Sequence, residues 1–356
     1  MKDKILYLGN FDCINGFAAV NRAIGNALLF NDIGFETLIY CKNSKAMAEF
    51  SFFSEHNISF IDRPDCSKFD AYFKYKEYLQ LIENIDGLKA IVLYNFPSFP
   101  FAKILKLCKR KGICVIGDIT EWYDTKSCGF LLKPIKKIDT SIRMRHLNKK
   151  CDGIILISNY LYNYYSNIKQ KILIYPIMDF VLWESKKCGF DVKNLEKHKI
   201  ALIGNNISSK DDISYFKKLL SSKQNYELNV IGFDGKFRIR NEKIHYYGHL
   251  LRKDVYKMLA ESSFSYVVRK GTRSNNAGFP TKFAESIVLG VPIIYSRFSD
   301  IGDLEKKYTF GFEKESFVET NCDTVEISKE FKLLFLADCY KDSMTTFLNN
   351  LIHPKL

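Results

Sequence analysis

The chain has 356 residues, of which 47% are hydrophobic, and a formal net charge of +13. This length is about twice that of an ordinary domain, so two domains with separate cores are expected. No stretch has 18 or more consecutive apolar residues, which excludes a membrane-spanning helix, and the basic excess favours nucleic acid, an anionic membrane surface or a phosphorylated ligand as partner.

The cysteines and the first residues give indications of the cellular compartment of the protein. Ten cysteines are scattered along the chain without a CxxC pair or any other metal-ligand spacing. Such a pattern is typical of reduced thiols and predicts no metal site. The first apolar stretch ends at Gly9, too soon for the core of a signal peptide. We therefore expect a cytoplasmic protein.

Short apolar runs alternate with helical patterns along the whole chain, as in doubly wound α/β folds. In the first half, strands are expected near residues 4–10, 36–41, 58–62, 90–94, 113–117, 153–157 and 172–175. In the second half, they are expected near residues 200–203, 228–232, 244–247, 264–268, 292–295 and 308–312.

The alternation predicts two Rossmann-like domains, 1–183 and 199–329. The polar stretch 184–198 is the expected linker, and 330–356 is a helical segment that could return to the first domain. Ligands of open parallel sheets bind beyond the carboxyl ends of the strands, where the strand order reverses. Two facing sheets would enclose a cleft, which is the expected site.

In the first domain, the loop 9–22 leads from a strand into a helix. Gly16 and the small residues after it would let the backbone approach a diphosphate closely. The loop is not a GxGxxG fingerprint, so a dinucleotide cofactor is disfavoured.

A second loop of this domain gathers carboxylates and aromatic side chains. Asp118, Glu121 and Trp122 follow the strand near 113–117. Carboxylates bind sugar hydroxyls and aromatic faces bind sugar rings, so this loop is the predicted acceptor side. The alternative is a structural loop with a buried Trp122.

Basic residues are concentrated between residues 101 and 150, which contain 13 Lys or Arg and 4 Asp or Glu. Within this region, 131–150 interleaves cationic and apolar residues. Such a segment suits peripheral contact with an anionic membrane. A solvated helix face is the alternative interpretation.

Residues 275–294 have the pattern of a glycine turn, a helix and a strand. Pro280 and Thr281 suit the first turn of that helix, whose free amides favour a phosphate, and Lys282 adds a full positive charge. Glu285, one turn further on, can accept two hydrogen bonds from a ribose diol. The alternative is a capped surface helix with both charged side chains in solvent.

This segment resembles the donor-binding signature of family 4 of the retaining glycosyltransferases, which have the GT-B fold of two facing Rossmann-like domains. The signature has two Glu residues separated by seven residues, a Gly-Phe pair between them, and a Gly-x-Pro-Ile ending. Gly278, Phe279 and Glu285 match it, and Gly290 begins the ending. The first Glu is replaced by Ala277, so the usual carboxylate for the donor sugar is missing. A branch associated with bacterial surface and capsular polysaccharides is closer, with Ala-Gly-Phe-Pro-Thr-Lys-Phe here.

The resemblance implies roles for further residues. Arg269 would neutralise the β-phosphate as the sugar bond breaks, unless it is an ordinary surface arginine. Lys210 matches the phosphate-binding lysine of a loop that also contains Asn205. Leu250 would pack on the nucleotide base, although it could equally belong to the core. Arg269 and Lys210 are thus the predicted catalytic residues.

The implied activity is retaining transfer of a hexose or related sugar from a UDP- or GDP-sugar, without a metal cofactor. The implied acceptor is a glycan or a lipid-linked glycan of surface polysaccharide biosynthesis. Two alternatives stay open, namely a sugar-nucleotide epimerase or hydrolase of the same fold and a non-catalytic binding module. Nucleic acid is the weaker ligand for such a module, because no recognition motif accompanies the basic region.

Overall fold

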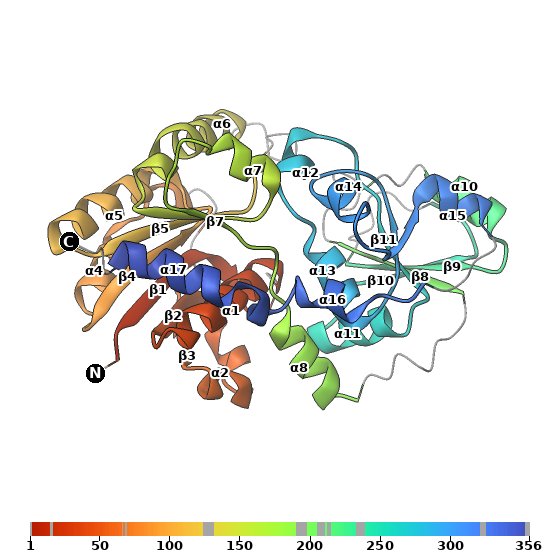
Figure 1. Cartoon of the computed structure of the whole chain (residues 1–356), viewed down its shortest axis with the longest axis horizontal. Coiled ribbons are helices and arrows are strands. Elements are labelled where there is room, and N and C mark those ends of the chain that lie inside the picture. The colour runs from red at the N-terminus through yellow and green to blue at the C-terminus, as the bar shows by residue number, and fades with distance from the viewer. Residues whose placement is uncertain are drawn as a thin grey trace. The chain divides into compact units, whose positions relative to one another are not determined.

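The computed structural model describes residues 2–14, 17–65, 67, 70–123, 132–189, 198–204, 211, 215–232, 239–320 and 325–352. The chain divides into two compact units, one of Met1–Ile177 with Ala337–Leu356 and one of Met178–Leu336. Each unit is built on its own parallel sheet (Figure 1). The two-domain α/β prediction is confirmed.

The first unit has a seven-stranded sheet in the order β3-β2-β1-β4-β5-β6-β7, and every paired strand runs parallel. Its strands are β1 (Lys4–Asp12), β2 (Glu36–Lys42), β3 (Ile58–Asp62), β4 (Leu88–Tyr94), β5 (Cys114–Ile119), β6 (Gly153–Leu156) and β7 (Lys171–Leu173). Its α-helices are α1 (Phe17–Asp32), α2 (Ser51–Glu55), α3 (Asp70–Phe73), α4 (Lys76–Glu83), α5 (Ser98–Lys111), α6 (Lys133–Ile142), α7 (Asn159–Tyr164) and α17 (Lys341–Ile352).

The second unit has a six-stranded sheet in the order β10-β9-β8-β11-β12-β13. Its strands are β8 (Lys199–Ile203), β9 (Glu227–Ile231), β10 (Ile244–Gly248), β11 (Phe264–Val267), β12 (Ile293–Tyr295) and β13 (Gly311–Glu313). Its α-helices are α8 (Asp179–Lys187), α10 (Tyr215–Ser222), α11 (Arg252–Ala260), α12 (Arg273–Ala277), α13 (Thr281–Leu289), α14 (Ile301–Leu304), α15 (Lys314–Glu319) and α16 (Lys329–Leu333).

The predicted strands are present in both sheets because their apolar runs are buried on both faces. The central positions of β1, β4, β6 and β11 are all buried, as a parallel sheet covered by helices requires. The strand order reverses between β1 and β4 in the first sheet and between β8 and β11 in the second. Each unit therefore has one switch point, where ligands of such sheets bind.

The division between the units differs from the expected boundary at residue 183, which falls inside α8. Helix α8 packs on α11 and α13, and its Glu184 forms a buried ion pair with Arg252 (Oε2 to Nε, 3.1 Å). These contacts make α8 part of the second unit instead of the first unit or a linker. Of the predicted linker, residues 190–197 lie outside the described part of the chain.

The last helix belongs to the first unit, although it is last in sequence. Helix α17 packs on α1 and on β7. Its buried side chains are Met344, Phe347 and Leu348. Helix α16, by contrast, packs on α13 in the second unit, so the predicted segment 330–356 is shared between the two units.

Candidate functional site

Helix α13 begins at the position expected for a ligand-binding helix. Pro280 precedes its first residue with extended backbone angles, and no side chain caps the helix start. Gly290 ends the helix in the left-handed region at φ 77°, which a side chain would disfavour. The first-turn amides of α13 therefore retain the partial positive charge that attracts phosphate.

Glu285 is fully buried on α13, one turn after the helix start. Lys282 donates a hydrogen bond to its Oε2 at 2.6 Å, while its Oε1 has no hydrogen-bond partner among the described residues. Leaving a buried acceptor unpaired costs roughly 1–3 kcal/mol. Glu285 is therefore not a solvated surface residue, and a ligand hydroxyl would reach Oε1 only if the side chains that cover it moved.

Lys282 lies between this carboxylate and solvent. Its side chain is 20% exposed, and its ammonium group is 5.9 Å from the centroid of the Tyr256 ring. Thr281 beside it is half-buried. Lys282 is therefore a partly exposed cation that is held by the buried carboxylate at the start of α13.

Arg269, two residues after the end of β11, is held by hydrogen bonds to its side chain and its backbone. Its Nε donates to Asp211 Oδ1 at 3.3 Å, and its backbone exchanges hydrogen bonds with Ser296 Oγ, at 2.9 Å from its amide and 2.8 Å to its carbonyl. Its side chain is 19% exposed. Arg269 is thus a positioned cation at the carboxyl end of a switch-point strand, not an unattached surface arginine.

The turn before α13 is secured by the loop that follows β12. The Ser299 amide donates to Asn276 Oδ1 at 3.2 Å, and the Ser299 hydroxyl donates to the Gly278 carbonyl. Phe279 is buried next to this turn, with its ring 5.5 Å from that of Phe283. Ser296 and Ser299 were not singled out in the sequence, because neither stands in a recognisable motif.

Ala277 is fully buried at the end of α12. Its methyl group offers no hydrogen bond, so this position cannot hold sugar hydroxyls as a glutamate would. Leu250 follows β10 and is half-buried, and its neighbour Leu251 is 63% exposed. Packing of Leu250 on a base stays a prediction.

Three of the predicted site residues, Gly16, Asn205 and Lys210, lie outside the described residues. Asp211, which directly follows the loop 205–210, forms an isolated antiparallel bridge with Arg269. Asp211 therefore lies beside the arginine.

Asp118 has a different role from the predicted one. It is fully buried, and Arg22 (3.0 Å), Asn26 (3.2 Å) and the Tyr7 hydroxyl all donate hydrogen bonds to its carboxylate. Burial and the nearby Asp118 raise the pKa of Tyr7, which keeps the phenol protonated as a donor. Asp118 is thus the centre of a buried network and is not available to an acceptor sugar.

Trp122 is also part of the interior, which confirms the structural alternative for this side chain. It is 9% exposed and packs edge-on against Tyr164, with ring centroids 4.9 Å apart. Glu121 is half-buried, and the ring centroid of Tyr123, two residues further on, lies 4.9 Å from the cationic groups of both Lys136 and Arg143. An acceptor role for Glu121 stays a prediction.

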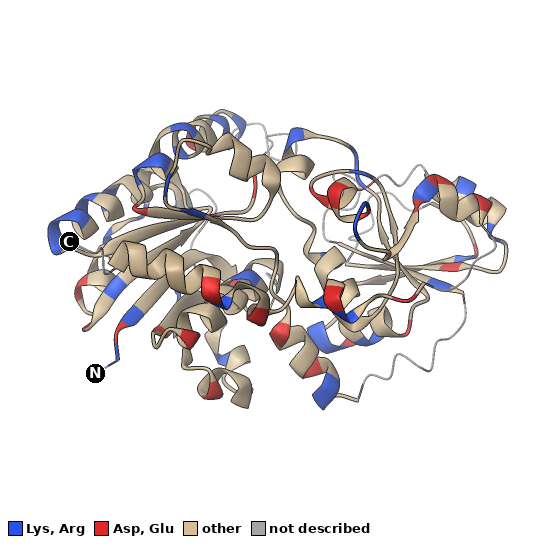
Figure 2. Cartoon of the chain, in the orientation of Figure 1, with Lys and Arg blue, Asp and Glu red and all other residues tan. Residues whose placement is uncertain are grey.

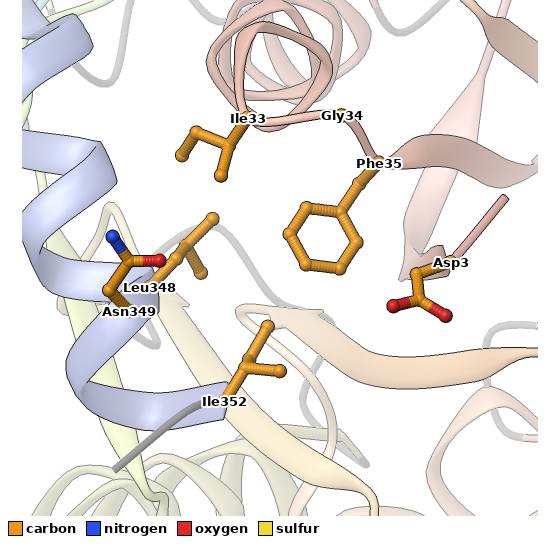
Figure 3. A pocket seen from close by; sticks show the side chains of 7 residues that line it. All are labelled: Asp3, Ile33, Gly34, Phe35, Leu348, Asn349 and Ile352. Carbon is orange, nitrogen blue, oxygen red and sulfur yellow. The ribbon is translucent and has the colours of Figure 1, made fainter. Parts of the chain in front are cut away.

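A cavity of about 290 Å³ lies in the first unit (Figure 3). Its lining residues are Asp3, Ile33, Gly34, Phe35, Leu348, Asn349 and Ile352. Asp3 and Phe35 directly precede β1 and β2, so the cavity lies at the amino ends of these strands. Ligands of parallel sheets bind at the opposite, carboxyl ends, and we assign this cavity no role in the site.

Within the described ranges, no three His, Cys, Asp or Glu side chains are placed to hold a metal ion. The helices of the same ranges include none that is long and apolar enough to cross a membrane. The seven cysteines whose state the structure records are free thiols.

No protein-family model matches the chain, and no curated protein matches its sequence. Solved structures are nevertheless similar in fold. The Anabaena HepE structure in complex with UDP and glucose aligns with a TM-score of 0.65 at 10% identity, over 98% of this chain and 100% of that one. AviGT4, a glycosyltransferase involved in avilamycin A biosynthesis, aligns with a TM-score of 0.60 at 9% identity, over 100% of this chain and 99% of that one.

An epimerase also has this fold. UDP-GlcNAc 2-epimerase from Methanocaldococcus jannaschii aligns with a TM-score of 0.52 at 10% identity, over 97% of this chain and 99% of that one. The chain therefore has the GT-B fold, with Rossmann-like domains on parallel sheets of seven and six strands.

Proposed function

We propose that this protein is a glycosyltransferase that uses a nucleotide-diphosphate sugar as donor, with UDP or GDP as the nucleotide. The observation that carries the proposal is the buried Glu285 carboxylate, one turn inside α13, whose Oε1 lacks a partner in the described part of the chain. A ribose diol would supply the missing donor. The UDP-bound HepE structure of the same fold supports this choice of ligand.

Several positively charged groups that could bind the donor phosphates lie at the carboxyl end of the second sheet. They are the first-turn amides of α13 and Lys282 at the start of that helix, and Arg269 after strand β11. Lys210 is proposed to add a further cation from the loop 205–210. These groups can stabilise the charge that develops on the β-phosphate, so the proposal needs no metal cofactor.

The proposed reaction is a retaining, same-face displacement. The bond between the anomeric carbon and the β-phosphate oxygen breaks, the acceptor oxygen bonds to the same face, and the departing phosphate takes the acceptor proton. Arg269 would stabilise the departing oxygen, and the rate would depend mainly on positioning and charge. The resemblance of 277–285 to the capsule branch supports this stereochemistry.

The acceptor is proposed to be a glycan or lipid-linked glycan of surface polysaccharide synthesis, and the transferred sugar a hexose or a related sugar. The same resemblance supports this role. The free thiols of the described cysteines are compatible with a cytoplasmic enzyme. Ala277 leaves the recognition of the sugar to other residues.

The function is tested by incubation with a panel of UDP- and GDP-sugars and candidate acceptors, followed by mass spectrometry of the products. A transferase releases free nucleotide and forms a glycoside. A changed nucleotide sugar would instead support an epimerase, which the shared fold also allows. Release of free sugar alone would indicate a hydrolase, and no turnover with any donor would contradict all three.

Replacement of Glu285 by glutamine is expected to weaken UDP or GDP binding about 10- to 150-fold, because hydrogen bonds to a charged group contribute roughly 1.5–3 kcal/mol. Isothermal titration calorimetry with the nucleotide measures this change. Glu261→Gln is the matched control, since Glu261 also contacts a lysine (Lys257, 3.9 Å) but is 43% exposed. Unchanged affinity in Glu285→Gln would remove its ribose role.

A further inference from the structure

The exposed residues of α5, α6 and the turns up to Lys150 form a surface of the first unit, here called the α5–α6 surface. The two helices pack against each other, and the Ser98 amide at the start of α5 donates to Asp139 Oδ1 of α6 at 2.6 Å. The exposed cations of this surface are Lys103, Lys106, Lys109, Arg110, Lys111, Lys133, Lys137, Arg145, Lys149 and Lys150.

Within the described part of residues 98–150, no exposed carboxylate balances these charges. Of the carboxylates between residues 98 and 150 that the structure describes, Asp118 and Asp139 are buried and Glu121 is half-buried. Lys and Arg therefore dominate α5 and α6 (Figure 2). The surface has a strong positive potential, which attracts an anionic partner.

Large apolar side chains lie among these cations. Phe99 is 44% exposed at the start of α5, and Ile138 and Ile142 of α6 are 60% and 41% exposed. Ile138 and Ile142 are four residues apart, so they share one face of the helix. Phe99 directly follows Ser98, which binds Asp139 of α6, and the Lys103 ammonium lies 5.4 Å from the centroid of the Phe99 ring.

We propose that the α5–α6 surface docks the protein on an anionic lipid bilayer. Cations beside exposed Phe and Ile on a surface helix are typical of helices that lie in the membrane interface. The cations would contact lipid headgroups while Phe99, Ile138 and Ile142 enter the acyl boundary. Nucleic acid fits less well, because its phosphate backbone offers no partner for aliphatic side chains. This inference is independent of the proposed transferase activity.

The structure also changes which residues of the predicted segment 131–150 can take part. Arg143 is only 2% exposed, and its Nη1 donates to the Asn95 carbonyl at 2.5 Å. Lys136 is half-buried against Tyr123. The α5–α6 surface therefore excludes Lys136 and Arg143, and only the exposed residues of the predicted segment belong to it.

The test is co-sedimentation of the full chain with vesicles of phosphatidylcholine, with and without about one third phosphatidylglycerol. Binding is expected only with the anionic lipid. The triple variant Lys103→Glu, Lys106→Glu and Lys137→Glu is expected to weaken it at least about 100-fold, since each cation near such a surface strengthens binding about fivefold. The control reverses three exposed lysines of the second unit, Lys253, Lys306 and Lys307, and should bind as the wild type.

A second variant tests insertion separately from charge. The fluorescence of Ile138→Trp, in a Trp122→Phe and Trp183→Phe background, is expected to shift to the blue when anionic vesicles are added. Circular dichroism confirms that each variant is folded. Equal loss of binding in both lysine variants would overturn the proposal, as would an unshifted spectrum. Binding to random DNA but not to vesicles would overturn it in favour of nucleic acid.

Discussion

Replacement of Arg269 by methionine is expected to lower kcat about 100- to 1000-fold, the usual effect of removing one group that stabilises developing charge in a transition state. The guanidinium is already held by Asp211 at Nε, and Ser296 holds the backbone of Arg269. It therefore needs little reorganisation when the sugar bond breaks. Steady-state kinetics with the donor identified by product analysis measure kcat and KM separately.

Arg240→Met is the matched control for this prediction, because Arg240 is an exposed arginine of the same unit. It should leave both constants unchanged. Arg269→Lys keeps the charge but loses the planar fork, so an intermediate kcat is expected. If Arg269→Met raised KM with kcat unchanged, the arginine would bind the donor without acting in the transition state.

Replacement of Asp118 by alanine is expected to lower the free energy of unfolding of the first unit by about 3–5 kcal/mol, because it leaves a buried cation without a partner. Arg22 is 2% exposed, and its other contacts are the carbonyls of Ile174 and Tyr175. A Trp183→Phe background leaves Trp122 of the first unit as the sole tryptophan, so its fluorescence in a urea titration follows that unit.

Two further variants test the cause of this destabilisation. Asp70→Ala removes an exposed partner of Lys74 (3.7 Å) and should change the free energy of unfolding by no more than about 1 kcal/mol. The double variant Asp118→Leu and Arg22→Met removes both buried charges and should recover much of the lost stability. A loss in the double variant equal to that of Asp118→Ala would show that the ion pair is not the cause.

Local pattern was sufficient for the secondary structure. Buried parallel strands are apolar throughout, and β1 and β8 could therefore be located by their runs at residues 4–10 and 200–203. The end of α13 at Gly290 was predictable for a similar reason, because a left-handed backbone angle favours glycine. These features depend on residues close together in the chain.

The site was predictable only where one short segment contains it. Gly278 to Glu285 form a turn and a helix start, so the relation of Lys282 to Glu285 follows from helical spacing. The partners of Arg269 could not be predicted in this way, since Asp211 and Ser296 come from separate loops. The burial of Asp118 beside Arg22 likewise depends on the packing of α1 against the sheet.

The sequence by itself determined two parallel-sheet domains, their strands, and a helix start suited to phosphate and ribose. Only the tertiary structure decided that α8 joins the second unit, that Asp118 and Trp122 are interior residues, and that Glu285 is buried with one oxygen that no described residue binds. The reason is physical. Strand and helix patterns record burial along a single segment, whereas the partner of a charged side chain is chosen by packing between segments far apart in the chain.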